Sequence, residues 1–267
     1  MNLTGSHGRT SGASDLLSAV QRHELWLYLG WQDIRQRYRR SVLGPFWLTI
    51  STGIQIGTLG FLWAALFHQD LHEFLPFFAV GLVLWSMVSG VMLEACTGFT
   101  QFESIIRQTR LPFSAFLLRI LCRHVIIFGH NLVIIALVLL FMGKGLTWTA
   151  LLFVPGLGLV ALLALFLSGP IAVFCTRFRD MPQILANLIN VLYYFTPIMW
   201  TPKTLASMPW VYEYNPLHHL FQIVRAPILG ELPSPLDYSW ALGSTALAAW
   251  AYLFLMGRFR HRIAYWI

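Results

Sequence analysis

All but three of the eighteen lysine and arginine residues lie in four clusters, and long apolar stretches separate the clusters. Cytoplasmic loops of membrane proteins retain Lys and Arg because these charges resist translocation. The pattern therefore predicts a multi-pass protein with both termini and two inner loops in the cytoplasm and three loops outside. The clusters are Arg9, Arg22, Arg35, Arg37, Arg39 and Arg40; Arg107, Arg110, Arg119 and Arg123; Arg177 and Arg179; and Arg258, Arg260 and Arg262.

The composition agrees with this topology. The 267 residues are 57% hydrophobic and 11% charged, with a mean hydropathy of +0.64, which is typical of a polytopic all-α membrane protein. The formal net charge of +7 would favour nucleic acid as a partner of a soluble protein, but here the positive-inside bias accounts for it. We therefore expect no nucleic-acid partner.

A helix needs about 20 apolar residues to cross a bilayer, and we predict six transmembrane helices within a permease domain at 45–257. A disordered N-terminus at 1–14 and an amphipathic interface helix with a basic linker at 15–44 precede this domain, and a cytoplasmic tail at 258–267 follows it. No internal repeat is visible, so a pathway through the membrane needs a second copy of the chain. The predicted spans are Pro45 to Phe67, Pro76 to Phe99, Phe113 to Met142, Ala150 to Cys175, Gln183 to Trp200 and Trp240 to Gly257.

Ahead of the first span, apolar residues recur at helical spacing and predict one helix lying along the inner membrane surface. An alternative is a lipid-anchoring helix that only sets the topology. The apolar stripe is Leu16, Val20, Leu27, Trp31, Ile34 and Tyr38.

Several motifs in order resemble ABC-2 type permeases that export polysaccharides, the group serving O-antigen, capsule, teichoic acid and mycobacterial galactan. The resemblance covers roughly Trp26 to the C-terminus, and the order of the motifs is more specific than any one of them. The motifs are the basic run and Gly-Pro break from Gly30 to Trp47, Phe102 to Arg107 with Leu111-Pro112, Arg177 to Asp180, Tyr193 to Trp200, and Asn215 to Leu217.

The resemblance implies a homodimer in the bacterial inner membrane that recruits two copies of a separate ATPase and moves a polyprenyl-pyrophosphate-linked glycan. The sequence supports this division of labour, because it contains no Gly-x-x-x-x-Gly-Lys-Ser/Thr phosphate loop. We expect ATP and Mg on the partner subunit and no cofactor on this chain. The inner loop Thr100 to Arg110 suits a coupling helix, although an ordinary solvated turn would carry similar charges. The predicted ATPase-docking residues are Arg22, Arg37, Glu103 and Arg107.

A polysaccharide conduit needs rigid aromatic faces with polar groups, because a sugar ring offers both C–H faces and hydroxyl edges. The predicted channel lining is therefore Thr49, Thr52, Gln55, Tyr193, Tyr194 and Phe195, while glycines in the first span have a packing explanation. Guanidinium groups bind phosphate oxygens in pairs, so the lipid pyrophosphate is predicted to approach at Arg39, Arg40 and Arg123.

The outer connection from Thr201 to Ser239 carries six prolines yet contains apolar residues at helical spacing. It predicts a re-entrant pair of helices that flanks an outer gate, with two helices lying flat on the outer leaflet as the alternative. The predicted gate residues are Asn215, Pro216, Leu220 and Phe221.

Two further features concern isolated polar residues. Glu94 is the one acid well inside a predicted span, and we expect it to form an intramembrane pair with Arg119 or Arg123, as a structural ion pair or in transport. His218 and His219 are adjacent and lack Asp, Glu or Cys at ligand spacing, so we predict interfacial histidines and no metal site.

Three functions remain open from the residues. An exporter of lipid-linked polysaccharide explains the motifs best, with an ABC-2 type permease for teichoic acid, a small molecule or a drug as the alternative. A small-molecule or drug exporter would not need the basic helix-to-span junction or a sugar-lined channel. A membrane-embedded glycosyl- or acyltransferase should show clustered catalytic carboxylates or a His-Asp pair facing the membrane surface. The acidic pairs Asp70 with Glu73 and Glu231 with Asp237 lie in predicted outer loops and, apart from His68 and His72, have no basic or histidine partner at catalytic spacing. We therefore expect a transporter subunit without enzymatic activity.

Overall fold

The computed structural model describes residues 11–37, 39, 44, 46–109, 111–145 and 147–267, and every regular element in these residues is helical. Five helices are long and apolar enough to cross a membrane: α3 (Phe46–Leu66), α4 (Leu71–Ala95), α6 (Phe113–Phe141), α7 (Phe153–Arg177) with the preceding η2 (Trp148–Leu152), and α11 (Pro235–Trp266). The all-α membrane fold is therefore confirmed. The sixth predicted span coincides with α8 (Met181–Phe195), whose 15 residues are too few for this group, so the count of six stays a prediction.

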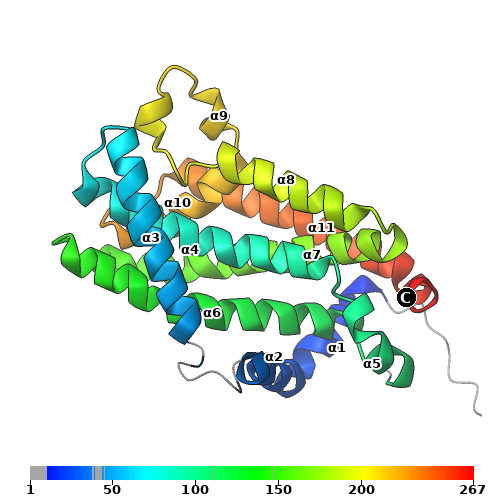
Figure 1. The fold of residues 1–267 in the computed structure, drawn as a ribbon. Helices are drawn as coiled ribbons and strands as arrows, with labels where there is room; N and C mark the ends of the chain where they lie inside the picture. Colours follow the sequence, from blue (N-terminus) through cyan, green and yellow to red (C-terminus); the bar gives the residue numbers. More distant parts are fainter. Residues whose placement is uncertain (1–10, 38, 40–43, 45, 110, 146) are drawn as a thin grey trace, which may run out of the picture.

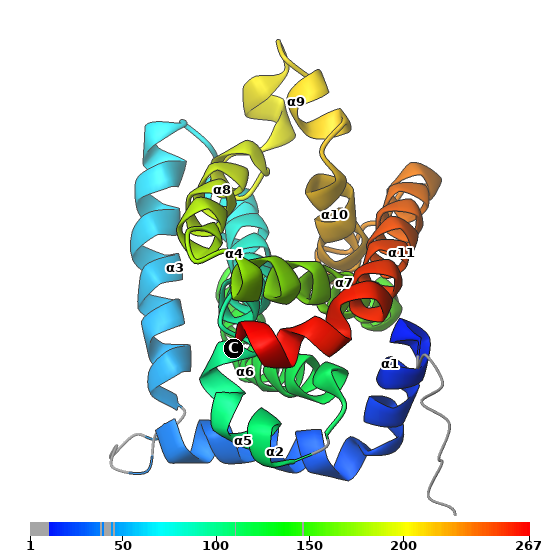
Figure 2. The same cartoon turned by 90° about the vertical axis from the view of Figure 1, so that its right-hand side faces the viewer.

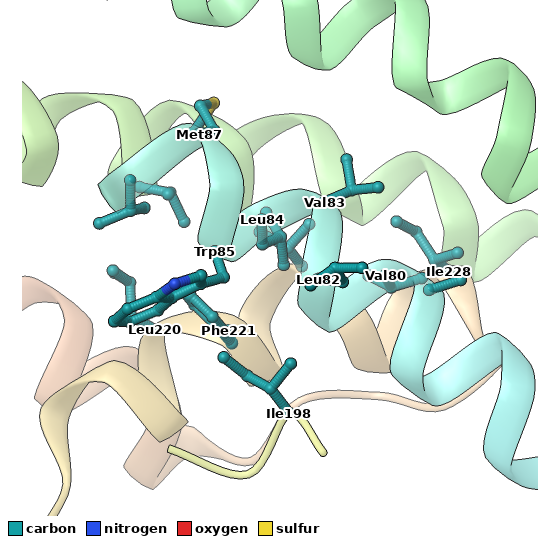
Figure 3. Packing of buried hydrophobic residues seen from close by; sticks show 14 of the residues in the cluster. Val80, Leu82, Val83, Leu84, Trp85, Met87, Ile198, Leu220, Phe221 and Ile228 are labelled. Atoms are coloured by element: carbon teal, nitrogen blue, oxygen red, sulfur yellow. The ribbon is translucent and has the colours of Figure 1, made fainter. Parts of the chain in front are cut away.

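Helix α4 is the most buried of the five spans and forms the centre of the bundle (Figure 1). It packs against α3, α6 and α7, and α7 in turn packs along α11. Trp85 of α4 contacts Phe221 of α10 (Pro216–Ile228), and Ile198 and Leu220 are buried beside them (Figure 3). One buried apolar cluster joins α3, α4, α6, α7, α8, α10 and α11, and most residues of α10 are buried although this helix has 13 residues.

Several predicted boundaries differ from the structure. Helix α4 begins at Leu71 rather than at Pro76, because the Asp70 side chain caps it by accepting from the His72 N–H at 3.0 Å. Helix α11 continues to Trp266, so the predicted tail at 258–267 extends the last helix. At the other end, α1 (Gly12–Gln21) begins inside the segment predicted to be disordered, of which residues 1–10 lie outside the described part.

The predicted interface helix is two helices, α1 and α2 (His23–Arg37), with a turn at Arg22 between them. Both lie at the end of the bundle that also carries α5 (Glu103–Gln108) and the end of α11 (Figures 1 and 2). Leu27 and Trp31 of the predicted apolar stripe are exposed, whereas Ile34 is buried. Since α2 also packs against α6, it has one side against the bundle and one apolar side available to lipid.

A buried carboxylate fixes α1 to this end of the bundle. Asp15 is 2% exposed and accepts hydrogen bonds from the Ser114 N–H at 2.8 Å and the Ser114 hydroxyl at 2.6 Å. It thereby caps α6, whose first N–H groups have no partner within the helix. The Tyr252 hydroxyl of α11 lies 2.7 Å from Ser114 Oγ, so three helices meet in one polar cluster.

Candidate functional site

Polar side chains form an exposed stripe along α8. Gln183, Asn187, Asn190 and Tyr194 are all exposed and recur at intervals of three and four residues, which places them on one face of the helix. Ile184, Leu188 and Val191 are exposed beside them. Among the residues of α8, Ile189 is the one fully buried in the core. Helix α8 thus offers a broad surface with amide groups along it.

Helix α3 carries a matching stripe. Ser51, Gln55 and Thr58 are exposed at the same helical spacing. Both helices lie on the flank of the bundle away from α11 (Figure 2). Exposed amides are costly against hydrocarbon, so polar groups within membrane helices normally face protein or a water-filled cavity. The two stripes therefore indicate a surface that water or another protein chain covers.

The predicted channel-lining residues fall into two groups. Gln55, Tyr194 and Phe195 are exposed on this flank. Thr49 is buried, Thr52 donates to the Leu48 carbonyl oxygen at 3.0 Å, and the Tyr193 ring lies 5.5 Å from the Trp85 ring. Thr49, Thr52 and Tyr193 thus point into the bundle, because the helical repeat turns adjacent positions to different faces.

A small, partly open cavity lies between α3, α4 and α6. Its volume is about 200 Å³, and Thr52, Ser86, His124 and Asn131 supply polar groups to its lining. The Asn131 side-chain oxygen is buried and has no hydrogen-bond partner in the described structure. A polar cavity of this size has room for water molecules that satisfy such groups.

An ionic network joins three helices at the end of the bundle near α2. Arg119 Nε donates to Asp33 Oδ2 at 2.7 Å, and Arg123 Nη1 lies 3.3 Å from the same oxygen. Arg123 also pairs with Glu94, whose Oε2 lies 3.0 Å from His124 Nε2. Glu94 therefore pairs with Arg123, one of its two predicted partners, while Arg119 pairs with Asp33.

The structure describes two of the three residues predicted to receive the lipid pyrophosphate. Arg39 is exposed, and Arg40 lies outside the described residues. Arg123 is held between Asp33 and Glu94, with 13% of its side chain exposed. The carboxylates of Asp33 and Glu94 balance the charges of Arg119 and Arg123 within this network, so Arg123 offers little net charge to a phosphate.

The predicted docking residues lie at the same end of the bundle. Glu103 and Arg107 form an exposed i,i+4 ion pair at 2.8 Å on the short helix α5, and Arg107 also donates to the Ile267 carbonyl oxygen at 2.8 Å. Arg22 is exposed at the turn between α1 and α2. Arg37 is the last residue of α2, and its side chain lies outside the described part.

The predicted gate residues join α8 to α10. The Asn215 side chain caps α10 by accepting from the Leu217 N–H at 2.9 Å, and its amide donates to the Phe195 carbonyl oxygen at 3.2 Å. Pro216 is the first residue of α10, and Leu220 and Phe221 are fully buried. A displacement of α8 would therefore be transmitted to α10 through Asn215.

The two adjacent histidines are buried in α10. His219 Nε2 donates to the Glu213 carbonyl oxygen at 2.7 Å, Nδ1 lies 2.6 Å from Asp237 Oδ1, and the ring stacks on Trp240. The His218 ring lies 5.5 Å from the Tyr212 ring. His219 thus links α10 to α11 and to α9 (Trp210–Glu213), and His218 packs against α9.

The sequence was compared with known proteins. The family described as ABC-2 type transporter matches residues 24–229, which is most of the chain. The chain belongs to the ABC-2 type transporter family. It is 24% identical over 191 residues to the O-antigen export system permease protein RfbA of Myxococcus xanthus, covering 71% of this chain and 69% of that protein. It is also 24% identical over 192 residues to the protein of the same description from Klebsiella pneumoniae, covering 70% of this chain and 73% of the relative.

The resemblance to ABC-2 polysaccharide permeases is therefore confirmed, and this chain is a transporter membrane subunit. Sequence reasoning missed the exposed amides Gln183, Asn187 and Asn190 of this ABC-2 permease. Their spacing along α8 was the available signal, since three amides at intervals of four and three residues are unusual in an apolar helix. Asp33 and His124 were also missed, because their partners come from helices distant in sequence.

Proposed function

We propose that two copies of this chain form the membrane channel of an ATP-driven exporter of lipid-linked polysaccharide. The observation that carries the proposal is the pair of exposed polar stripes on α3 and α8. A helix of 15 residues is about 22 Å long and cannot cross a hydrocarbon core of roughly 30 Å alone. Such a helix, with amides along its outer face, needs protein or water beside it. A second copy of the chain would supply the protein surface and enclose water between the two copies.

The substrate follows from the chemistry of this flank and from the relatives. Gln55, Asn187 and Asn190 can exchange hydrogen bonds with sugar hydroxyls, and Tyr194 and Phe195 offer faces to C–H groups. Contacts of this kind are weak and repeat along the helix, which suits a sliding polymer. Both relatives named above are described as O-antigen export permeases, which favours a polysaccharide over a small molecule or a drug.

Energy is proposed to come from a separate ATPase that binds the end of the bundle carrying α1, α2 and α5. There Arg22, Glu103 and Arg107 are exposed, and we assign both chain termini and this end to the cytoplasm on the distribution of basic residues. The opposite end, with α9 and η3 (Pro202–Leu205), then faces outward, and α10 is a re-entrant helix behind the gate. The lipid pyrophosphate is proposed to approach near Arg39 at the inner end.

Reconstitution tests this function. The chain and its native ATPase would be placed in proteoliposomes loaded with polyprenyl-diphosphate glycan, and glycan exposed on the far side would be measured with an added lectin. We expect ATP-dependent exposure from the complex and neither exposure nor ATP hydrolysis from the chain alone. ATP hydrolysis by the isolated chain, or exposure that is independent of ATP, would contradict the proposal.

A further inference from the structure

Arg225 of α10 is a fully buried cation. It is 1% exposed, and none of its three guanidinium nitrogens has a hydrogen-bond partner in the described structure. The guanidinium carbon lies 3.8 Å from the centre of the Phe77 ring. Gly81 leaves the space that the guanidinium fills, because a Cβ at that position would collide with Nη2. Helix α4 is therefore shaped to hold this group in place.

Within the described chain, Arg225 forms no ion pair with a carboxylate. All eleven Asp and Glu residues lie in the described part of the chain, and the ion pairs found there do not include Arg225. The Phe77 face compensates a guanidinium only partly, by a contribution of about 2 kcal/mol when desolvated. A buried ion without hydrogen bonds costs more than this. An external anion would remove the cost.

Arg225 also belongs to the lining of a cavity. This cavity has a volume of about 550 Å³ and lies between the start of α4, the start of η3 and the end of α10. The volume falls within the range of about 300–1,000 Å³ that is usual for small-molecule sites. The other polar groups of the lining include the amides Gln69 and Gln222 and the carboxylates Asp70, Glu73 and Glu231. Amides and carboxylates in this arrangement suit hydroxyl groups.

We propose that this cavity binds a hydroxyl-rich molecule bearing one oxyanion, with Arg225 as the group that recognises the anion. A guanidinium offers paired N–H donors that match carboxylate or phosphate oxygens. The ligand is an acidic sugar unit or the glycerophosphate group of a lipid, which share this chemistry. If the ligand is an acidic sugar unit, the inference rests on the proposed function, and the site then holds exported glycan beside the outer gate. The oxyanion site itself does not depend on export.

Thermal unfolding of the purified chain in a polyoxyethylene detergent tests the site, because this detergent carries neither phosphate nor sugar. The probes are glucuronate, glycerol 3-phosphate, uncharged glucose and inorganic phosphate. We expect glucuronate or glycerol 3-phosphate to raise the melting temperature in a concentration-dependent manner, and glucose to have no effect. Whichever charged probe acts identifies the source. The outcome is independent of export, because neither ATPase nor lipid-linked glycan is present.

Substitutions then locate the effect. Arg225→Met removes the charge and should weaken binding of the effective probe at least tenfold, which corresponds to the loss of about one charge-assisted hydrogen bond. Arg179→Met is the matched control at an exposed arginine. If Arg225→Met does not fold, Arg225→Lys keeps the charge without the paired donors and should still weaken binding. No stabilisation by either charged probe, an equal effect of inorganic phosphate, or unchanged binding in the Arg225 variants would overturn the proposal. The proposal would also be overturned if Glu73→Gln or Glu231→Gln lowered the melting temperature of the protein without a probe while no probe raised it. Arg225 would then have an internal partner.

Discussion

Asp33 of α2 and Arg119 of α6 are joined by a hydrogen bond of 2.7 Å between Oδ2 and Nε. Arg123 lies 3.3 Å from the same carboxylate oxygen and pairs with Glu94 of α4. The surface helix that we propose to meet the ATPase is thus connected to α6 through Arg119 and to α4, the central helix of the bundle, through Arg123. A movement of α2 would therefore act directly on the transmembrane helices through these ion pairs.

Asp33→Asn should therefore loosen α2. The substitution leaves Arg119 and Arg123, whose side chains are 13% exposed, without their shared counter-charge. We expect a loss of about 2 kcal/mol in the free energy of unfolding, together with faster proteolysis within α2. Glu24→Gln, at an exposed position of the same helix, is the control and should change neither. Equal proteolysis of the two variants would show that the network does not hold α2.

Two glycines of α7 offer a matched test of helix packing. A Cβ at Gly156 would lie 2.5 Å from the Ile223 carbonyl oxygen of α10, whereas a Cβ at Gly158 would meet nothing within 4 Å. Gly156→Ala should lower the free energy of unfolding by about 1–3 kcal/mol through overpacking, and Gly158→Ala should leave it unchanged or raise it slightly. Chemical unfolding in detergent measures both. Equal stability of the two variants would contradict the close packing of α7 and α10.

The two adjacent tyrosines of α8 should respond differently to truncation. Tyr194 is exposed on the polar stripe, and Tyr193 packs on Trp85. Tyr194→Ala is expected to reduce glycan export severalfold with little change in melting temperature, because a contact face for the sugar is lost. Tyr193→Ala should lower the melting temperature, because an aromatic contact with the core is removed. Export assays and melting curves of both variants would distinguish these outcomes, and the reverse assignment would refute the orientation of α8.

Exchange of Glu103 and Arg107 tests the docking surface. The double variant Glu103→Arg with Arg107→Glu keeps an i,i+4 pair of opposite charges, so α5 should remain stable. The exchange does, however, invert the charges that the ATPase would meet at these two positions. We expect the variant to reach the membrane and retain its melting temperature while co-purification of the ATPase falls severalfold. Normal recruitment would place the docking surface elsewhere.

Periodicity and charge predicted much of this fold. Features that depend on contacts between segments distant in sequence were not predicted. The spans at α3 and α6 agree with the predicted ranges to within a residue or two, because length and apolar composition define them. The start of α4 was missed because Pro76 suits the first turn of a helix and favours a start there, although Asp70 is a preferred capping residue. Likewise, Asp33 looked like a surface residue of an amphipathic helix, and its partner Arg119 is 86 residues away. Arg225 is one of the three basic residues outside the four clusters, and no pattern in the neighbouring sequence predicts its burial.

The accessibility of Asn187 to water tests the proposed channel most directly. A single cysteine would be placed there in a background where Cys96, Cys122 and Cys175 are replaced by alanine; all three native thiols are buried. Leu247→Cys, on the exposed apolar face of α11, is the control. With the ATPase bound and ATP added, a charged, membrane-impermeant thiol reagent should modify Asn187→Cys from at least one side of the membrane, and a lipid-soluble maleimide alone should modify Leu247→Cys. Modification of Asn187→Cys by the lipid-soluble reagent alone would contradict a water-filled conduit along α8.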